Sequence, residues 1–325
     1  MKRFLVAISL AVLAGAGPGS NVGKPIQSGR LTVFPVFGAR SGPDARYLTL
    51  DEGLQAGLVS VDEAGRMVRR GPMAGGGASV NQLALTNRAD RPLMLLAGEI
   101  VSGGKQDRVV GQDRVVPPHS DVPLGVFCVE PGRWTGASLE FGAAKLMAHP
   151  ELRKQALVTK DQQQVWNEVA NGRNYMAANA PPAMRAEVMT GSSYAKSADT
   201  MAMRQVLETA ASSLLPQIPD DAVGVVVAVD NRIVWADVFP SAALFRRYRV
   251  KLLQSYVVES YRGIGGGRAL TADDAASFLR DVSGHQTIEV EPGIYRLVRY
   301  EAGGTITYQL EEPGGQPLHF ARMTR

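Results

Sequence analysis

The sequence of 325 residues contains a single cysteine, Cys128, so an internal disulfide is excluded and packing must supply the stability of the fold. Its four histidines show no paired spacing, and the HExxH and CxxC patterns are absent. We therefore predict no dedicated metal site. The GxxxxGKS/T spacing of a Walker loop is also missing, and nothing else in the sequence calls for a cofactor.

The chain also has little excess of either charge. Its 35 basic and 31 acidic residues give a formal net charge of +4, which falls to +2 if Lys2 and Arg3 are removed with an N-terminal leader. Nucleic acids and anionic membranes require a clustered basic face, so we expect neither as a partner. With 45% apolar and 20% charged residues, the composition is that of an ordinary globular protein.

The N-terminus has the pattern of an export signal. Lys2 and Arg3 precede an apolar run at residues 4–13, and the small residues 14–16 follow it. About ten apolar residues are too few to span a bilayer, which takes roughly twenty. We predict a signal peptide at residues 1–19, a flexible leader at 20–29, and a periplasmic or secreted protein with no stable membrane span. The alternatives are a buried helix and an uncleaved anchor.

Short runs of alternating apolar residues, separated by turns, predict a β-rich sandwich-like or barrel-like part at residues 30–142. Residues 143–325 then predict a helical segment and a C-terminal part of helices and hairpins, either separate or forming one compact unit with the preceding part. The fold class is therefore α+β. We see no internal repeat.

Several local signals can be placed more closely. Helix-forming residues dominate 146–170 and 183–215, and we expect a break at 171–182. Asp230-Asn231 predicts a hairpin turn. Thr49 or Asp51 is expected to cap a short helix, and Thr271 to cap another in a box with Asp274.

Polar chemistry is densest between Glu99 and Arg108. Glu99 is a candidate general base. The block that follows supplies the candidate ligand-binding residues Gly103, Gly104, Lys105, Gln106, Asp107 and Arg108. Exposed backbone amides at the two glycines, with a lysine and an arginine beside them, suit a phosphorylated or nucleotide-like ligand. The alternative is a tight surface hairpin in which Glu99 pairs with Lys105 or Arg108.

A second block, residues 128–134, reads CVEPGRW. Cys128 and Glu130 share one face of a strand, so the cysteine is a candidate nucleophile and the glutamate a candidate catalytic carboxylate. An inert packed thiol and an intermolecular disulfide are the alternatives for Cys128. Arg133 can clamp an anion with Trp134 as a stacking platform, or the pair can cap the β core. We expect both blocks in one β-rich part.

The GGKQDR block at residues 103–108 and the CVE-x-GRW block at 128–134 resemble the signature of a bacterial family. This is the ARG and Rhodanese-Phosphatase-superfamily-associated protein domain, in which ARG denotes ADP-ribosylglycohydrolase. The resemblance runs from about Leu31 to the C-terminus. It implies an unsettled activity and a domain that binds or processes an ADP-ribose or nucleotide-derived ligand. An exported location points instead to another anion or to a structural role.

Three hypotheses follow. The first is a site that binds or hydrolyses an anionic small molecule around Glu99, Lys105, Arg108 and Arg133. The second is a non-catalytic extracytoplasmic interaction or structural module. The third is a cysteine hydrolase that uses Cys128. The sequence specifies neither a reaction nor a protein partner.

Overall fold

The computed structural model of the chain describes residues 5–6, 21–38, 46–63, 81–133 and 140–325. Packing divides the chain into two compact units, each assembled from separate stretches. Unit 1 comprises Met1–Asp44, Ala210–Tyr256 and Gly263–Arg325, and unit 2 comprises Ala45–Thr209 and Val257–Arg262. Of the predicted signal peptide, only residues 5–6 are described.

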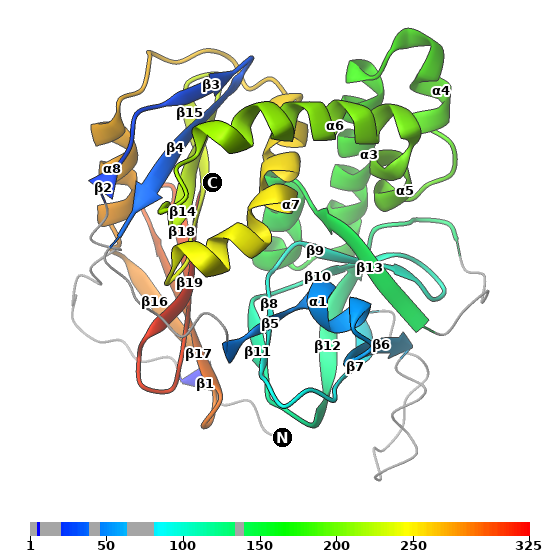
Figure 1. Cartoon of the computed structure of the whole chain (residues 1–325), viewed down its shortest axis with the longest axis vertical. Coiled ribbons are helices and arrows are strands. Elements are labelled where there is room, and N and C mark those ends of the chain that lie inside the picture. The colour runs from blue at the N-terminus through cyan, green and yellow to red at the C-terminus, as the bar shows by residue number, and fades with distance from the viewer. Residues whose placement is uncertain (1–4, 7–20, 39–45, 64–80, 134–139) are drawn as a thin grey trace. The chain divides into compact units, whose positions relative to one another are not determined.

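Unit 1 is built on a sheet of ten strands among the described residues, and all of its neighbouring strands run antiparallel (Figure 1). In sheet order the strands are β1 (Leu5–Val6), β16 (His285–Glu291), β17 (Tyr295–Ala302), β18 (Thr305–Glu311), β19 (Pro317–Thr324), β15 (Arg232–Val238), β14 (Gly224–Val229), β4 (Leu31–Phe37) and β2 (Asn21–Val22), with β3 (Ile26–Ser28) also paired to β4. Residues 21–28, predicted as a flexible leader, thus carry two short strands.

Helices cover both faces of this sheet. On one face, α8 (Ala272–Arg280) contributes Leu279 to a core with Phe34, Val226 and Phe320. On the other face, α7 (Ala242–Ser260) stacks Tyr248 on the ring of a phenylalanine that follows β15, at 5.3 Å between centroids. Burial of these large apolar side chains is the main favourable contribution to folding of the unit.

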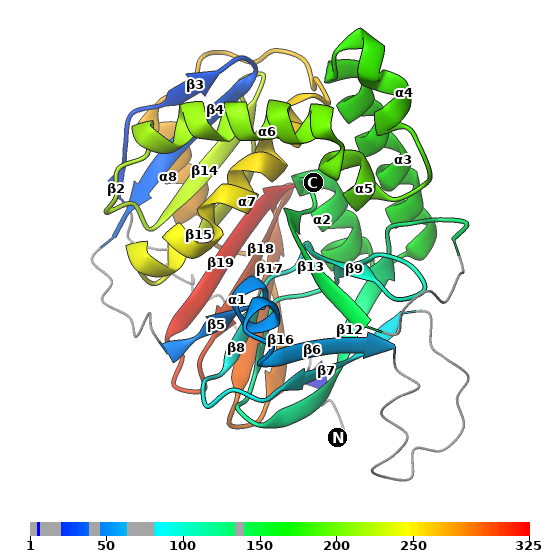
Figure 2. The same ribbon diagram turned by 45° about the vertical axis from the view of Figure 1, so that its right-hand side comes forward.

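Unit 2 is built on a closed barrel, because six strands pair in a ring (Figure 2). In order they are β10 (Arg108–Val110), β12 (Ser120–Cys128), β7 (Gln82–Asn87), β6 (Val59–Glu63), β13 (Glu140–Met147) and β9 (Glu99–Gly103). A small sheet, β11 (Arg114–Val116), β8 (Leu93–Leu95) and β5 (Leu48–Thr49), lies alongside. Alternation places Leu83, Leu85 and Val61 in one apolar core, as expected for strands with one buried face.

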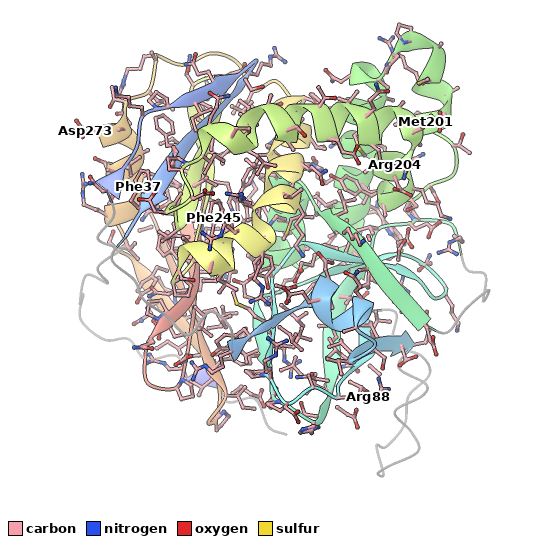
Figure 3. The ribbon with its side chains drawn as sticks, viewed as in Figure 1. Phe37, Arg88, Met201, Arg204, Phe245 and Asp273 are labelled. Atoms are coloured by element: carbon pink, nitrogen blue, oxygen red, sulfur yellow. The ribbon has the colours of Figure 1, made fainter. Side chains whose placement is uncertain are left out.

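The helices of unit 2 are mostly short. They are α1 (Leu50–Gln55), α2 (Pro150–Lys154), α3 (Gln162–Asn179), α4 (Arg185–Val188) and α5 (Tyr194–Asp199). Two further helices, α6 (Met201–Leu214) and α7, have residues in both units. Figure 3 labels Phe245 on α7, which is 1% exposed, and Met201 at the start of α6, which is 68% exposed. No helix in the described part of the chain is both long and apolar enough to cross a membrane.

The predicted α+β class is confirmed. Asp230 and Asn231 both have positive φ, as a tight hairpin turn requires, and Thr271 forms the predicted capping box with Asp274. Thr49, rather than Asp51, caps α1.

The predicted helix boundaries around residue 160 were wrong. The helical stretch expected at 146–170 is divided at Lys160, which has a φ of +53°, and Asp161 caps a new helix. That helix, α3, continues through the predicted break as far as Asn179. Tertiary packing has therefore overridden local propensity here.

Candidate functional site

The two motif blocks meet on neighbouring strands of the barrel. β9 leads into the GGKQDR turn, β10 leaves it, and β10 pairs with β12 so that Arg108 lies directly opposite Cys128. Gly103 and Gly104 have φ of +130° and +52°, values that favour glycine. A Cβ atom on Gly103 would lie 2.6 Å from the carbonyl oxygen of Glu140. Packing is thus sufficient reason for glycine at this position.

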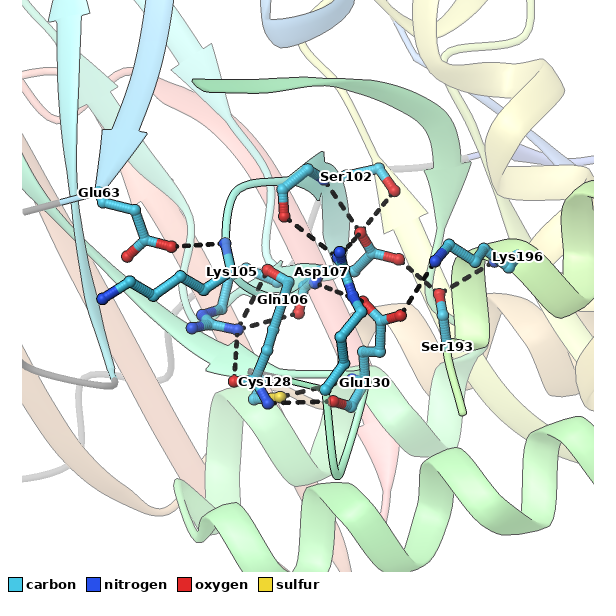
Figure 4. A network of polar contacts seen from close by, with 12 residues as sticks. Glu63, Ser102, Lys105, Gln106, Asp107, Cys128, Glu130, Ser193 and Lys196 are labelled. Carbon is cyan, nitrogen blue, oxygen red and sulfur yellow. Dashed lines mark hydrogen bonds and ion pairs between the residues drawn. The ribbon is translucent and has the colours of Figure 1, made fainter. Parts of the chain in front are cut away.

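Asp107 is the most heavily bonded carboxylate of the turn (Figure 4). It is 1% exposed, and its Oδ1 accepts hydrogen bonds from the Ser102 hydroxyl at 2.7 Å and the Gly103 amide at 3.0 Å. Its Oδ2 accepts from the Ser193 hydroxyl at 2.5 Å, and Arg133 Nη2 lies 3.7 Å from Oδ1. Both oxygens are therefore engaged by donors of the chain itself.

Glu130 is buried beside Asp107 and is engaged in the same way. Its Oε2 lies 2.6 Å from Arg133 Nε and accepts from the Asp107 amide at 3.1 Å. Its Oε1 accepts from Lys196 Nζ at 3.2 Å. Figure 4 shows Lys196 and Ser193 reaching this network from the start of α5. The two carboxylates thus connect the motif turn to a helix.

Arg108 is also buried, with 1% of its surface exposed. Its Nη1 donates to the carbonyl oxygen and Oε1 of Gln106, both at 3.1 Å, and to the Asp107 carbonyl at 3.4 Å. Its buried Nε has no acceptor, and no carboxylate of the described residues lies within ion-pair distance of the guanidinium. Burial lowers the pKa of Arg108, and nearby Cys128 and Glu63 oppose that shift only in part.

Cys128 is fully buried at the end of β12. Its backbone N and O atoms are both bonded to the side-chain amide of Gln162, each at 2.9 Å. The Sγ atom accepts from the Glu130 amide at 3.4 Å and lies near the Trp166 indole. Burial raises the pKa of the thiol more than these donors and Arg108 lower it. A neutral packed thiol is the chemistry that this environment favours.

Alkylation tests that description of Cys128. Iodoacetamide is expected to label the folded chain slower than the urea-unfolded chain by about a hundredfold or more, because reaction needs both exposure and the thiolate. Mass spectrometry over a time course measures both rates. Similar rates in the two states would show that Cys128 is accessible and ionised in the native fold.

Glu99 is separated from the rest of the motif. It begins β9, whereas the Gly103 that ends this strand belongs to the turn. Four steps of about 3.3 Å place the two residues about 13 Å apart. Glu99 is 1% exposed, and its Oε2 accepts from the Leu96 amide at 2.8 Å. The candidate general base therefore lies away from the GGKQDR turn, although Arg108 pairs opposite Val101, two residues along β9 from Glu99.

The remaining predicted ligand residues border the network. The Lys105 amide donates to Glu63 Oε1 at 2.9 Å, and the Gln106 amide group donates to the Glu130 carbonyl at 3.2 Å. Arg133 Nη2 lies 3.4 Å from the Gly103 carbonyl. Trp134, predicted as a stacking platform, lies outside the described residues.

Sequence reasoning missed Glu63, Ser193 and Lys196. They lie 42, 86 and 66 residues from their partners in the motif, and no spacing pattern marks them. One sequence feature does mark Ser193, because a serine directly before a helix is a typical N-cap. Its hydroxyl accepts from the Lys196 amide, as that role requires.

A buried trio formed by His149, Glu168 of α3 and Tyr194 of α5 was missed as well. The Tyr194 hydroxyl accepts from the His149 amide at 3.3 Å and is hydrogen-bonded to His149 Nδ1 at 2.9 Å. His149 Nε2 then donates to Glu168 Oε1 at 2.9 Å, and Asn171 donates to Oε2 at 2.9 Å. A Cβ on Gly172 would lie 2.7 Å from His149 Cε1. The trio is closed to solvent and packs tightly, which is typical of structural polar networks.

A pocket of about 530 Å³ lies elsewhere on unit 2, between α1, β6 and β13. Its polar lining includes Asp62, Arg88, Glu140 and Lys145, and it contains none of the predicted ligand residues. Within the described ranges, no group of three or more His, Cys, Asp or Glu side chains is arranged to hold a metal ion.

The chain belongs to the family of the ARG and Rhodanese-Phosphatase-superfamily-associated protein domain, whose model matches residues 19–322. The match covers nearly the whole chain, including all of unit 2 and most of unit 1. No curated protein and no solved structure matches the chain.

Proposed function

We propose that this chain is an exported protein that binds a phosphorylated small ligand of the ADP-ribose or nucleotide class at Arg108, between the GGKQDR and CVEPGRW blocks. The family description, which refers to ADP-ribosylglycohydrolase and phosphatase-like associations, supports the ligand class. The N-terminal sequence pattern supports export.

The observation that carries the proposal is the buried guanidinium of Arg108, which has no carboxylate partner among the described residues and no acceptor for its Nε there. Leaving a charge buried without a counter-ion costs several kcal/mol. Asp107 and Glu130 lie nearby, yet their oxygens are engaged by Ser102, Ser193, Arg133 and Lys196. A phosphate oxygen would supply both the acceptor for Nε and the missing negative charge.

Any hydrolytic step would need a carboxylate with a free oxygen, and we propose Glu63 for that role. Its Oε1 accepts from the Lys105 amide, and among the described residues its Oε2 has no hydrogen-bond partner. Asp107 and Glu130 lack such an oxygen, and Glu99 lies at the far end of β9. Glu63 can therefore accept a proton from water without breaking the network.

A thermal-shift titration tests binding at Arg108. ADP-ribose, AMP and ribose 5-phosphate are expected to raise the melting temperature by about 2–4 °C at concentrations well above Kd, whereas ribose alone is not. Arg108→Gln is expected to abolish the shift because the guanidinium supplies the phosphate contact.

The matched control is Arg88→Gln, an exposed arginine of the same unit whose Nη2 bonds only to the Ser60 hydroxyl among the described residues. It should respond to the ligands as the wild type does. If no phosphorylated ligand shifts the midpoint, or if Arg108→Gln shifts equally, the proposal fails. A non-catalytic module, held by the Asp107 and Glu130 contacts to α5, would then be the better account.

A further inference from the structure

A row of polar side chains crosses the face of the unit 1 sheet that α8 covers. Gln286 lies opposite Tyr300, Tyr300 opposite Thr307, and Thr307 opposite Arg322. Residues directly opposite in neighbouring strands share a face of the sheet. Arg322 in turn lies opposite Ala236, which belongs to the apolar core beneath α8. The row therefore places polar side chains next to the apolar core that α8 covers.

Arg322 is the charged end of this row and is 3% exposed. Its Nη2 donates to the Thr305 hydroxyl at 3.0 Å, and its guanidinium carbon lies 5.1 Å from the centre of the Phe278 ring on α8. Among the described residues, its Nε and Nη1 have no hydrogen-bond partner. Two of the three guanidinium nitrogens are thus buried with donors unused, which is rare in folded proteins.

No carboxylate of the described residues compensates the charge of Arg322 by direct contact. Burial lowers the pKa of Arg322, and the exposed carboxylate of Asp281 opposes this only in part. A buried water molecule could accept the unused hydrogen bonds, but it would supply no charge. A small anion would supply both the hydrogen-bond acceptors and the negative charge.

We propose that unit 1 binds a small oxyanion of phosphate or sulfate size at Arg322, beneath α8. The neighbours of Arg322 suit such a ligand, because Thr305 and Thr307 add hydroxyl groups on the same strand, β18. The Tyr300 hydroxyl accepts from Gln286 at 3.1 Å, so its own proton is available to an acceptor. Thr305 is partly exposed and gives the site an edge at solvent.

Inorganic phosphate is the probe for the whole chain. At equal ionic strength against sodium chloride, phosphate is expected to raise the melting temperature by about 2–4 °C and to saturate in the millimolar range. Phosphate and sulfate also stabilise proteins without binding, through exclusion from the surface, and that effect grows steadily with concentration. The saturable part is the signature of a site.

Arg322→Gln is expected to remove the saturable part. Arg299→Gln is the matched control, because Arg299 lies one position from Tyr300 on β17, contacts Glu301 at 2.5 Å and points to the opposite face. It should keep the saturable part.

Two results would overturn the inference. One is a wild-type melting temperature that rises with phosphate concentration without saturating. This measurement needs no variant, so it tests the inference even if Arg322→Gln fails to fold. The other is a folded Arg322→Gln chain that keeps the saturable shift. Arg322→Lys, which preserves the charge but not the planar group, is expected to bind phosphate at least about tenfold more weakly.

Discussion

Asp107→Asn is expected to lower the free energy of unfolding by about 3 kcal/mol, the largest effect of any single substitution in the motif. The carboxylate is 1% exposed and accepts from Ser102, Gly103 and Ser193. An amide replaces one acceptor oxygen with a donor and removes one of the two carboxylate partners of Arg133. Urea unfolding followed by circular dichroism measures the change.

Asp199→Asn is the control for this substitution. Asp199 ends α5, its side chain is 78% exposed, and it lies 3.6 Å from Arg204. Exposed ion pairs contribute little to stability, so Asp199→Asn should change the free energy of unfolding by no more than about 0.5 kcal/mol. A loss below about 1 kcal/mol for Asp107→Asn would mean that the buried network contributes little to the fold, and would favour a role for Asp107 in ligand contact.

The local parts of the structure were predictable because their causes are local. A hairpin turn at Asp230-Asn231 follows from residues that tolerate positive φ, and the Thr271–Asp274 box follows from two side chains three positions apart. The two motif blocks lie on paired strands of one barrel, which adjacent β-rich segments made reasonable to expect. Such features depend on few residues and short separations.

The partners of the motif were not predictable from the sequence, because the fold alone brings them together. Ser193 reaches Asp107 only because the helix that it caps packs against the barrel. Glu99 shows the opposite error. Its closeness in sequence suggested a place beside the GGKQDR turn, but an extended strand carries it about 13 Å from Gly103 and leaves it two residues from Val101, the partner of Arg108.

The continuation of α3 through Gly172 has a tertiary cause as well. The break expected at 171–182 includes Gly172, and a glycine costs about 1 kcal/mol in a helix. In the structure, a Cβ on Gly172 would lie 2.7 Å from His149 and 2.8 Å from Tyr194. The glycine is what allows the helix to pass close to the buried trio, and only the packed structure reveals that requirement.

Glu168→Gln is expected to lower the free energy of unfolding by about 2 kcal/mol at pH 7. This loss should become smaller as the solution is made acidic. Burial alone would raise the pKa of Glu168. The hydrogen bond and charge of His149, the Asn171 amide and the charge of Arg262 together outweigh burial, so the pKa lies below its ordinary value of 4.5. A carboxylate with a depressed native pKa contributes stability that is present above the unfolded pKa and is lost as the pH falls through the native pKa.

Urea unfolding of the wild type and of Glu168→Gln at several pH values between 7 and 3 measures this dependence. The difference between the two chains should be largest above about pH 5 and should narrow below pH 4.5, because the unfolded wild type then takes up the proton first. Glu187→Gln, an exposed glutamate on α4, should differ from the wild type by less than about 0.5 kcal/mol at every pH. A Glu168→Gln cost that stays constant from pH 7 to pH 3 would show that the trio is held by shape and packing rather than by the charge of Glu168.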